Sequence, residues 1–160
     1  MFVEIDEMKS VMYKYQMDEI TEADNDLVLI AIQAATDQVK SYFRPGNKKN
    51  WQDGRPLYDA TVIFGKTKPT PEQLSNSESD ERNPLLVEIV KNIAEWYLLR
   101  LSNVDIMFEQ VKDRYDRDID WLKQVQSGEV ILDLPIIADN EIGEEKQPFR
   151  FGSRTKFAHE

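Results

Sequence analysis

Residues 60–67 have the spacing of a phosphate-binding loop, with lysine and threonine at the end and alanine in place of the first glycine. Such a loop needs small, flexible residues whose backbone amides surround the phosphates, followed at once by a helix. Here the loop positions hold Thr, Val, Ile and Phe, which favour an extended strand. Pro69 and Pro71 follow where a helix interior would be required. The sequence therefore predicts a strand and a turn at this place, and no phosphate site.

Three aspartates, Asp113, Asp116 and Asp120, are spaced to lie on one face of a helix. Oxygen ligands gathered in this way could hold a divalent cation. However, Arg114 and Arg117 alternate with them, as on a solvated, ion-paired helix surface, and no histidine is near in the sequence. We therefore favour the solvated surface over a metal site.

The only histidine, His159, is the second residue from the C-terminus, where chains are usually frayed. A catalytic base must be held rigidly, so His159 is a poor candidate, and no Ser-His-Asp set can be assembled without it. The chain has no cysteine, which excludes thiol catalysis, disulfides and thiolate metal sites. Its 30 Asp and Glu residues supply carboxylate pairs, but nothing marks one pair above another. We expect no enzyme, no cofactor and no metal.

The length and the charge of the chain limit the classes of protein to which it can belong. The 160 residues are enough for one domain with a real core. The formal net charge of -10 argues against binding nucleic acid with the surface as a whole, because such binders cluster Lys and Arg. The first residues lack the pattern of a secretory signal, and the longest apolar run, residues 27–32, is far too short to span a bilayer. We expect a soluble, acidic protein made inside the cell, with no membrane partner.

Apolar periodicity predicts a mainly α fold, a small bundle of about four helices. Thr21 with acids in the following turn indicates the start of the second helix, and Asn83 before Pro84 indicates the start of the third. Gly128 fits the position just past the end of the fourth. The four expected helices span residues 6–17, 21–43, 84–101 and 104–126.

The second expected helix carries two apolar stripes side by side, so it should be the central one. One stripe consists of Leu27, Ile30, Ala31 and Ala34. The other consists of Val28, Ile32, Ala35, Val39 and Tyr42.

Residues 44–83 form a long insertion loop between the second and third helices, with four prolines and three glycines. Loops of this length are uncommon in compact domains and usually indicate function or disorder. Only residues 58–64 look like a strand, which could form one half of a β-hairpin. A second short strand is predicted at residues 129–134. We divide the chain into a helical domain, 1–145, and an extended basic C-terminal tail, 146–160.

The tail is the candidate interaction site. Residues 146–157 contain four bases and no acid, and three phenylalanines alternate with the bases. Exposed phenylalanines cost solubility unless they dock somewhere. The tail either folds back on its own domain or docks on another subunit or a partner, and we favour the second. The candidate residues are Phe149, Arg150, Phe151, Arg154, Lys156 and Phe157.

Three stretches of the chain come in a recognisable order: residues 31–42, residues 89–99, and residues 111–122 followed by Gly128 and Leu132. The most specific piece is the succession Arg-Tyr, Ile-x-Trp-Leu and Gly-x-x-x-Leu. About 90 of the 160 residues take part. The chain thus resembles the Mu-like group of head-tail connector proteins, the adaptor or head-completion proteins in the neck of tailed bacteriophages. It departs from that group by an aspartate, Asp118, where a small residue is usual, and by the longer connection 44–83.

The resemblance implies a structural virion protein of the phage neck, made in the host bacterial cytoplasm. Such proteins are helical bundles that form a ring, commonly twelvefold, beneath the portal. The ring extends the DNA channel and provides a platform for a tail-side neck or tail-terminator protein. An acidic ring would let DNA pass without specific binding, because its charge repels phosphates. The basic tail would suit docking on a neighbouring subunit or the portal, and the loop 44–83 an inter-ring contact.

A second hypothesis belongs to another class. The chain could be a small helical interaction module that binds one acceptor protein through its C-terminal tail and stays monomeric. The two hypotheses differ in what the tail contacts, a ring neighbour or portal in the first and a single acceptor in the second.

Overall fold

The computed structural model describes residues 1–43, 56–75, 79–100 and 108–137, and confirms the mainly α fold. The described residues form no strand, and their one β feature is an isolated antiparallel bridge between Tyr58 and Ile136. No helix in these ranges is both long and apolar enough to cross a membrane. The elements are the 3-10 helix η1 (Ile5–Ser10) and the α-helices α1 (Lys14–Thr21), α2 (Asn25–Phe43), α3 (Ala60–Gly65), α4 (Pro71–Ser75), α5 (Pro84–Leu99) and α6 (Phe108–Ser127).

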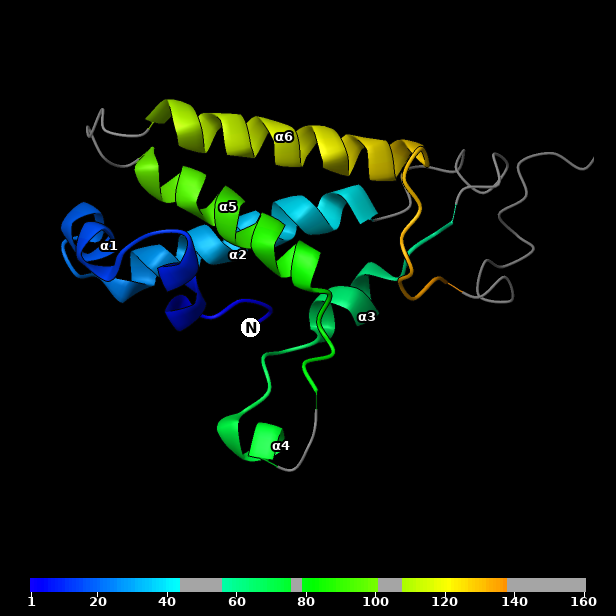
Figure 1. Cartoon of the computed structure of the whole chain (residues 1–160), viewed down its shortest axis with the longest axis horizontal. Helices are drawn as coiled ribbons and strands as arrows, with labels where there is room; N and C mark the ends of the chain where they lie inside the picture. Colours follow the sequence, from blue (N-terminus) through cyan, green and yellow to red (C-terminus); the bar gives the residue numbers. More distant parts are fainter. Residues whose placement is uncertain (44–55, 76–78, 101–107, 138–160) are drawn as a thin grey trace, which may run out of the picture.

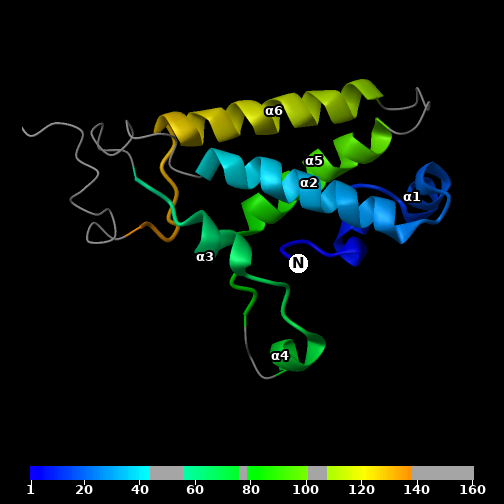
Figure 2. The same cartoon turned by 180° about the vertical axis from the view of Figure 1, so that it is seen from behind.

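Three long helices, α2, α5 and α6, make the body of the molecule (Figures 1 and 2). The helix α5 contacts both α2 and α6, and α2 and α6 also touch. At one end of α2 lie α1 and η1, and at the other end lies α3 (Figure 1). The interior is mainly aliphatic with some buried aromatic side chains. Its fully buried aliphatic side chains include Ile32, Val39, Leu86, Val90, Ile93, Leu98 and Leu122.

The start of α5 and the end of α6 are where local signals placed them. The Asn83 side chain accepts hydrogen bonds from the backbone of Leu85 and Leu86 at 3.0 and 3.2 Å, and Pro84 occupies the first turn. Beyond α6, Gly128 has a φ of 82°, a left-handed conformation that glycine adopts without strain. Both predicted caps are confirmed. The predicted residues 101 and 104–107 lie outside the described ranges.

The first predicted helix, residues 6–17, is wrong as a single element. The chain instead forms η1, then an extended residue at Tyr13, then α1. The backbone amides of Val11 and Met12 both donate to the carbonyl of Met8 at 3.0 Å, which closes the first piece. With this break, Met8, Met12 and Met17 are all buried. Burial of their apolar surface stabilises the broken arrangement relative to one continuous helix.

Thr21 closes α1 and does not open α2, so the predicted start is also wrong. Its hydroxyl donates to the carbonyl of Met17 at 2.8 Å, as serine and threonine do inside helices. The chain then turns through Glu22 and Ala23, both at positive φ. The helix α2 starts four residues later than predicted, and Asp24 accepts a hydrogen bond from the Asp26 amide at 2.8 Å.

The helix α2 is central, and one of its two predicted stripes is the buried one. Its buried residues are Val28, Ala31, Ile32, Ala35, Val39 and Phe43. Of the other stripe only Ala31 is buried, whereas Leu27, Ile30 and Ala34 are exposed. Ile30 is 64% exposed, which leaves an apolar strip on the outer side of this helix.

Residues 58–64 do not form a strand, which corrects the prediction. Asp59 caps a short helix instead, because its carboxylate accepts from the amides of Thr61 and Val62 at 2.9 and 3.1 Å. The helix α3 then buries Ile63 and Phe64 in the core.

Residues 129–134 do not form the predicted strand either, although the segment up to residue 137 returns past α3. The Asp59 amide donates to the carbonyl of Pro135 at 2.9 Å, and the Ile137 amide to that of Leu57 at 2.7 Å. The Tyr58 hydroxyl accepts from the Leu132 amide at 2.7 Å. These few bonds fix where the described chain ends, beside α3.

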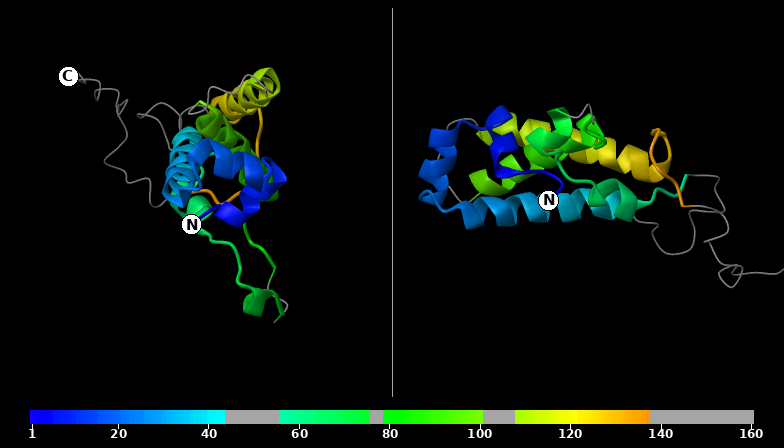
Figure 3. Two further views of the ribbon diagram at one scale, coloured as in Figure 1. Left: turned by 90° about the vertical axis from the view of Figure 1, so that its left-hand side faces the viewer. Right: turned by 90° about the horizontal axis from the view of Figure 1, so that it is seen from below.

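Between α3 and α5 the chain leaves the body and returns. We call the described residues 66–75 and 79–82 the arm. The arm carries α4 at its tip, well separated from the three long helices (Figure 1; Figure 3, left). It belongs to the predicted insertion 44–83, whose residues 44–55 and 76–78 lie outside the described ranges.

Candidate functional site

The six candidate residues of the tail, Phe149, Arg150, Phe151, Arg154, Lys156 and Phe157, lie outside the described residues, as does His159. Their role therefore stays a prediction.

The phosphate-loop pattern at residues 60–67 has the wrong geometry for phosphate binding. Its loop positions form α3 itself, and no helix begins directly after Lys66, whose backbone is extended. The Lys66 ammonium is already engaged, because it donates to the Glu81 carbonyl at 3.0 Å and lies 3.6 Å from the Glu81 carboxylate. The lysine holds the two sides of the arm together.

The aspartates of α6 face solvent. Asp113, Asp116 and Asp120 are all exposed, and Asp120 pairs with Lys123 at 2.8 Å. Among the described residues no group of three His, Cys, Asp or Glu side chains is placed to hold a metal ion.

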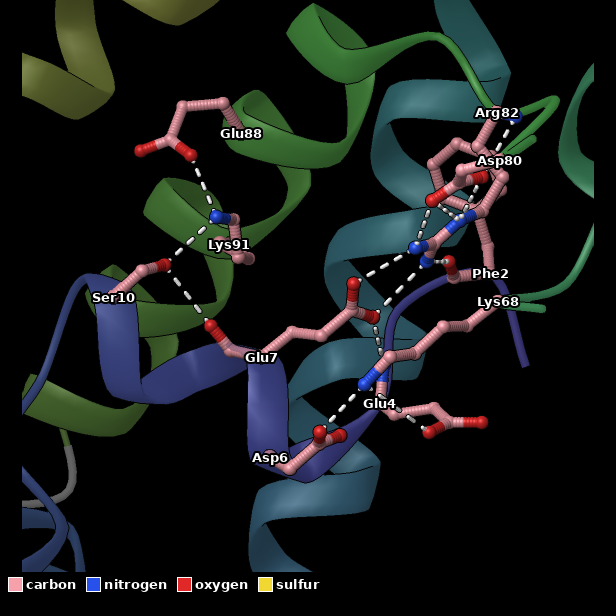
Figure 4. Close-up of polar contacts among 10 residues, drawn as sticks. All are labelled: Phe2, Glu4, Asp6, Glu7, Ser10, Lys68, Asp80, Arg82, Glu88 and Lys91. Atoms are coloured by element: carbon pink, nitrogen blue, oxygen red, sulfur yellow. Dashed lines mark hydrogen bonds and ion pairs between the residues drawn. The ribbon is translucent and has the colours of Figure 1, made fainter. Parts of the chain in front are cut away.

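The densest polar site lies at the base of the arm, around Arg82 (Figure 4). The Arg82 side chain is only 3% exposed, and its donors are fully used. It contacts Asp80 at 2.6 to 3.1 Å, the Glu7 carboxylate at 2.8 and 3.0 Å, and the carbonyl oxygen of Phe2 at 2.6 Å. We call these four residues the Arg82 clamp. It joins the N-terminal segment to the end of the arm.

The charges of the clamp stabilise one another. Burial alone would raise the pKa of Glu7, but hydrogen bonds from Arg82 and from the Glu4 amide, which lies at 2.9 Å, outweigh burial and lower it. The Arg82 hydrogen bonds likewise lower the pKa of Asp80. In return, Glu7 and Asp80 raise the pKa of Arg82. All three groups are therefore charged at neutral pH.

Two further lysines extend this polar site (Figure 4). Lys68, from the outgoing side of the arm, pairs with Asp6 and lies 3.8 Å from Glu4, so it holds the arm to η1. Lys91 of α5 donates to the Ser10 hydroxyl at 2.7 Å and pairs with Glu88 at 2.6 Å. The N-terminal segment is thus tied both to the arm and to α5.

This arrangement is suited to holding a segment in place and not to chemistry. Arg82, Lys68 and Lys91 each have carboxylate partners, and the carboxylates that clamp Arg82 are held in their charged form. A general acid or base at neutral pH needs a pKa near 7, and pairing with Arg82 moves the pKa values of Glu7 and Asp80 the other way, against the effect of burial. The clamp fixes the base of the arm while its tip extends from the body.

A second polar site lies between α5 and α6. Glu95 is buried and pairs with Arg114, whose Nη2 donates to Oε1 at 3.2 Å. The same nitrogen lies 3.1 Å from Oε2 without hydrogen-bond geometry, so Oε2 has no hydrogen-bond partner among the described residues. Burial raises the pKa of Glu95 in spite of Arg114. Burial also raises the pKa of Asp118, which accepts from the Asn92 amide at 2.9 Å.

Hydrogen bonds also connect all three long helices. The Tyr97 hydroxyl donates to Gln38 at 2.7 Å, and the Gln38 amide donates to the Tyr115 hydroxyl at 3.1 Å. Trp96 stacks on the Tyr115 ring with centroids 5.2 Å apart. These aromatics pack between helices.

A depression of about 320 Å³ opens between α2, α3 and the N-terminus. Phe2 and Phe64, whose rings lie 5.0 Å apart, form its apolar part. The residues that line it are Met1, Phe2, Gln33, Thr36, Asp37, Lys40 and Phe64.

Sequence reasoning missed the Arg82 clamp. Its one local signal is Asp80, two residues before Arg82, because an Asp-x-Arg pair directly ahead of the Asn83 cap can close on itself. No pattern relates Arg82 to Glu7, since 75 residues separate them.

Comparisons with protein-family models, with curated proteins and with solved structures found no match to this chain.

Proposed function

We propose that this chain is a ring-forming head-tail connector of a phage neck, which docks on the portal, extends the DNA channel and provides the platform for the tail. The succession Arg-Tyr, Ile-x-Trp-Leu and Gly-x-x-x-Leu carries the proposal. These residues lie on α6 and in the turn that follows it, where Ile119 and Leu122 are buried and Gly128 ends the helix.

The clamped arm supports the proposal. A ring requires a heterologous interface, in which two different surfaces of one subunit meet. An arm whose base is held by Arg82 and Lys68, and whose tip lies away from the body, offers such a surface in a preorganised form. Preorganisation reduces the entropy lost when the contact forms.

The charge distribution also fits a channel that DNA passes through. The net charge is -10, and the bases of α6 alternate with exposed acids and do not gather into a patch. Such a surface offers phosphates no cluster of cations to bind.

The test is co-sedimentation of the purified protein with the portal ring encoded by the same genome. A stoichiometric, ring-sized complex is expected. Replacing Arg150, Phe151 and Arg154 by alanine should prevent assembly and leave the helical circular dichroism unchanged. A matched control replaces two exposed bases, Lys112 and Arg117, and an exposed leucine, Leu85, by alanine. This control variant should assemble normally.

A well-folded monomer that does not bind the portal would contradict the proposal. Unimpaired assembly of the tail variant would remove the tail from the contact and leave the arm as the surface to map. The alternative, an interaction module, predicts a monomer that binds one acceptor and loses that binding when residues 146–160 are deleted.

A further inference from the structure

The depression between α2 and α3 is lined by both apolar and polar side chains. Phe2 and Phe64 form its apolar part and are themselves buried, and Met1 beside them is 45% exposed. A cavity of about 150 Å³ is enough to bind benzene. The depression is open to solvent, and its volume of about 320 Å³ leaves room for a phenylalanine ring.

Two charges at the depression have no ion-pair partner among the described residues. They are Asp37 and Lys40, one turn apart on α2. The other residues of α2 that line the depression, Gln33 and Thr36, are uncharged.

The described chain ends close to this depression. Ile136 bridges Tyr58, the Tyr58 ring lies 5.6 Å from Phe43, and the Phe43 ring lies 5.6 Å from Phe64 in the wall of the hollow. Eleven residues, 138–148, separate the last described residue from Phe149. Extended, they span about 36 Å, more than the ~28 Å length of α2.

We propose that residues 149–151 dock in this depression of their own chain, with a phenylalanine ring on Phe2 and Phe64 and the Arg150 guanidinium on Asp37. Arg150 and Asp37 carry opposite charges, so a contact between them is favourable.

Docking within one chain is favoured because the tail is covalently connected to the domain that carries the depression. A segment tethered by a short flexible linker has an effective concentration in the millimolar range at a site it can reach. A tail from another molecule would have to exceed that concentration. The proposal does not depend on the connector function, since it concerns the free subunit.

The chain has no cysteine, so a spin label can be attached at one chosen position. Ser153→Cys places the label two residues beyond Phe151. In the full-length protein, we expect the label to attenuate the amide signals of residues 33–40 and of Phe64 relative to the reduced label. The attenuation should not depend on protein concentration.

Variants of the labelled chain test the named contacts. Phe149→Ala with Phe151→Ala should abolish the attenuation, and Asp37→Lys should weaken it. Adding Arg150→Glu to Asp37→Lys should restore it, because the charges are then exchanged. Asp37 is exposed, so these substitutions leave the core intact.

A mixture of labelled chains with isotope-enriched, label-free chains separates the two sources of contact. No attenuation in the mixture is expected. Attenuation of residues 33–40 and of Phe64 in the mixture would overturn docking within one chain. In the labelled full-length protein, attenuation only at other residues, or no attenuation, would overturn the depression as the site. None of these results alters the outcome of the portal experiment, so the two proposals fail independently.

Discussion

Arg82 and Glu7 face one another through two hydrogen bonds, from Nη2 to Oε1 at 2.8 Å and from Nη1 to Oε2 at 3.0 Å, although 75 residues separate them in the chain. Charge-assisted, two-pronged contacts of this kind fix orientation as well as distance. The pair therefore makes the N-terminal segment and the base of the arm one structural unit.

Arg82→Met should destabilise the protein by about 2–3 kcal/mol. Removing one partner of a buried ion pair costs ~3–5 kcal/mol, and the partial exposure of Glu7 and Asp80 reduces that figure. Urea unfolding followed by circular dichroism measures the change. Arg117→Met on the exposed face of α6 is the control and should stay within about 0.5 kcal/mol of wild type. Equal stability of the two variants would contradict a stabilising clamp.

The difference between wild type and Arg82→Met should depend on pH. The pKa values of Glu7 and Asp80 lie below their ordinary values of 4.5 and 3.8 in the folded protein. Their contribution to stability is therefore present above those values and is lost as the pH falls through the lowered pKa values. Unfolding free energies should differ by a constant amount near neutral pH and converge in acid. A difference that grew in acid would contradict the assignment.

Asp118→Asn should stabilise the protein at neutral pH, by less than about 1 kcal/mol. Burial raises the pKa of Asp118, so its charged form is disfavoured, and an asparagine can still accept the Asn92 hydrogen bond. The advantage is largest above the raised pKa and disappears as the pH falls through it, because the wild-type carboxyl is then neutral too. Asp116→Asn, at an exposed position of the same helix, should show no such pH-dependent gain.

Tyr58→Phe should cost about 1–2 kcal/mol, because it leaves the half-buried Leu132 amide without its acceptor at 2.7 Å. Thermal unfolding measures the loss, and hydrogen exchange at Leu132 should become faster. Tyr13→Phe removes a hydroxyl from a side chain that is 68% exposed and should be neutral. Slow exchange at Leu132 in the Tyr58 variant would show that another acceptor replaces the hydroxyl.

Gly128→Ala should destabilise by about 1 kcal/mol, because φ is 82° there and alanine is strained at positive φ. Gly65→Ala is the matched substitution, and it should stabilise the protein. A Cβ at Gly65 meets nothing within 4 Å, and alanine favours the helical conformation of α3. Opposite signs in the two unfolding free energies would confirm both backbone assignments, and equal signs would contradict one.

Helix ends that depend on neighbouring residues were predictable. The cap at Asn83 and the stop at Gly128 need only side chains and backbone a few residues away. The same kind of signal was present at Asp59, whose carboxylate caps α3, but the β-branched and aromatic residues after it favoured a strand. The strand propensity of these residues did not decide their structure, because no described segment pairs with them as a neighbouring strand. The helix α3 instead buries Ile63 and Phe64 in the core.

The candidate site was less predictable than the fold. The basic, phenylalanine-rich tail is visible in composition alone, but no local rule names the surface that receives it. The depression exists only because Phe2, Phe64 and α2 meet in space. For the same reason the exposure of Ile30 could not be read from its spacing, since Ala31 on the same predicted stripe is buried.

By itself, the sequence determined the helical class, the central position of α2, the start of α5 and the end of α6, because these depend on composition, periodicity and contacts within one turn. Only the tertiary structure decided that the first helix breaks at Tyr13, that α3 replaces a strand, and that Arg82 meets Glu7. These features depend on burial and charge pairing between distant segments. The free energy of such contacts depends on the packed whole and not on any stretch of residues.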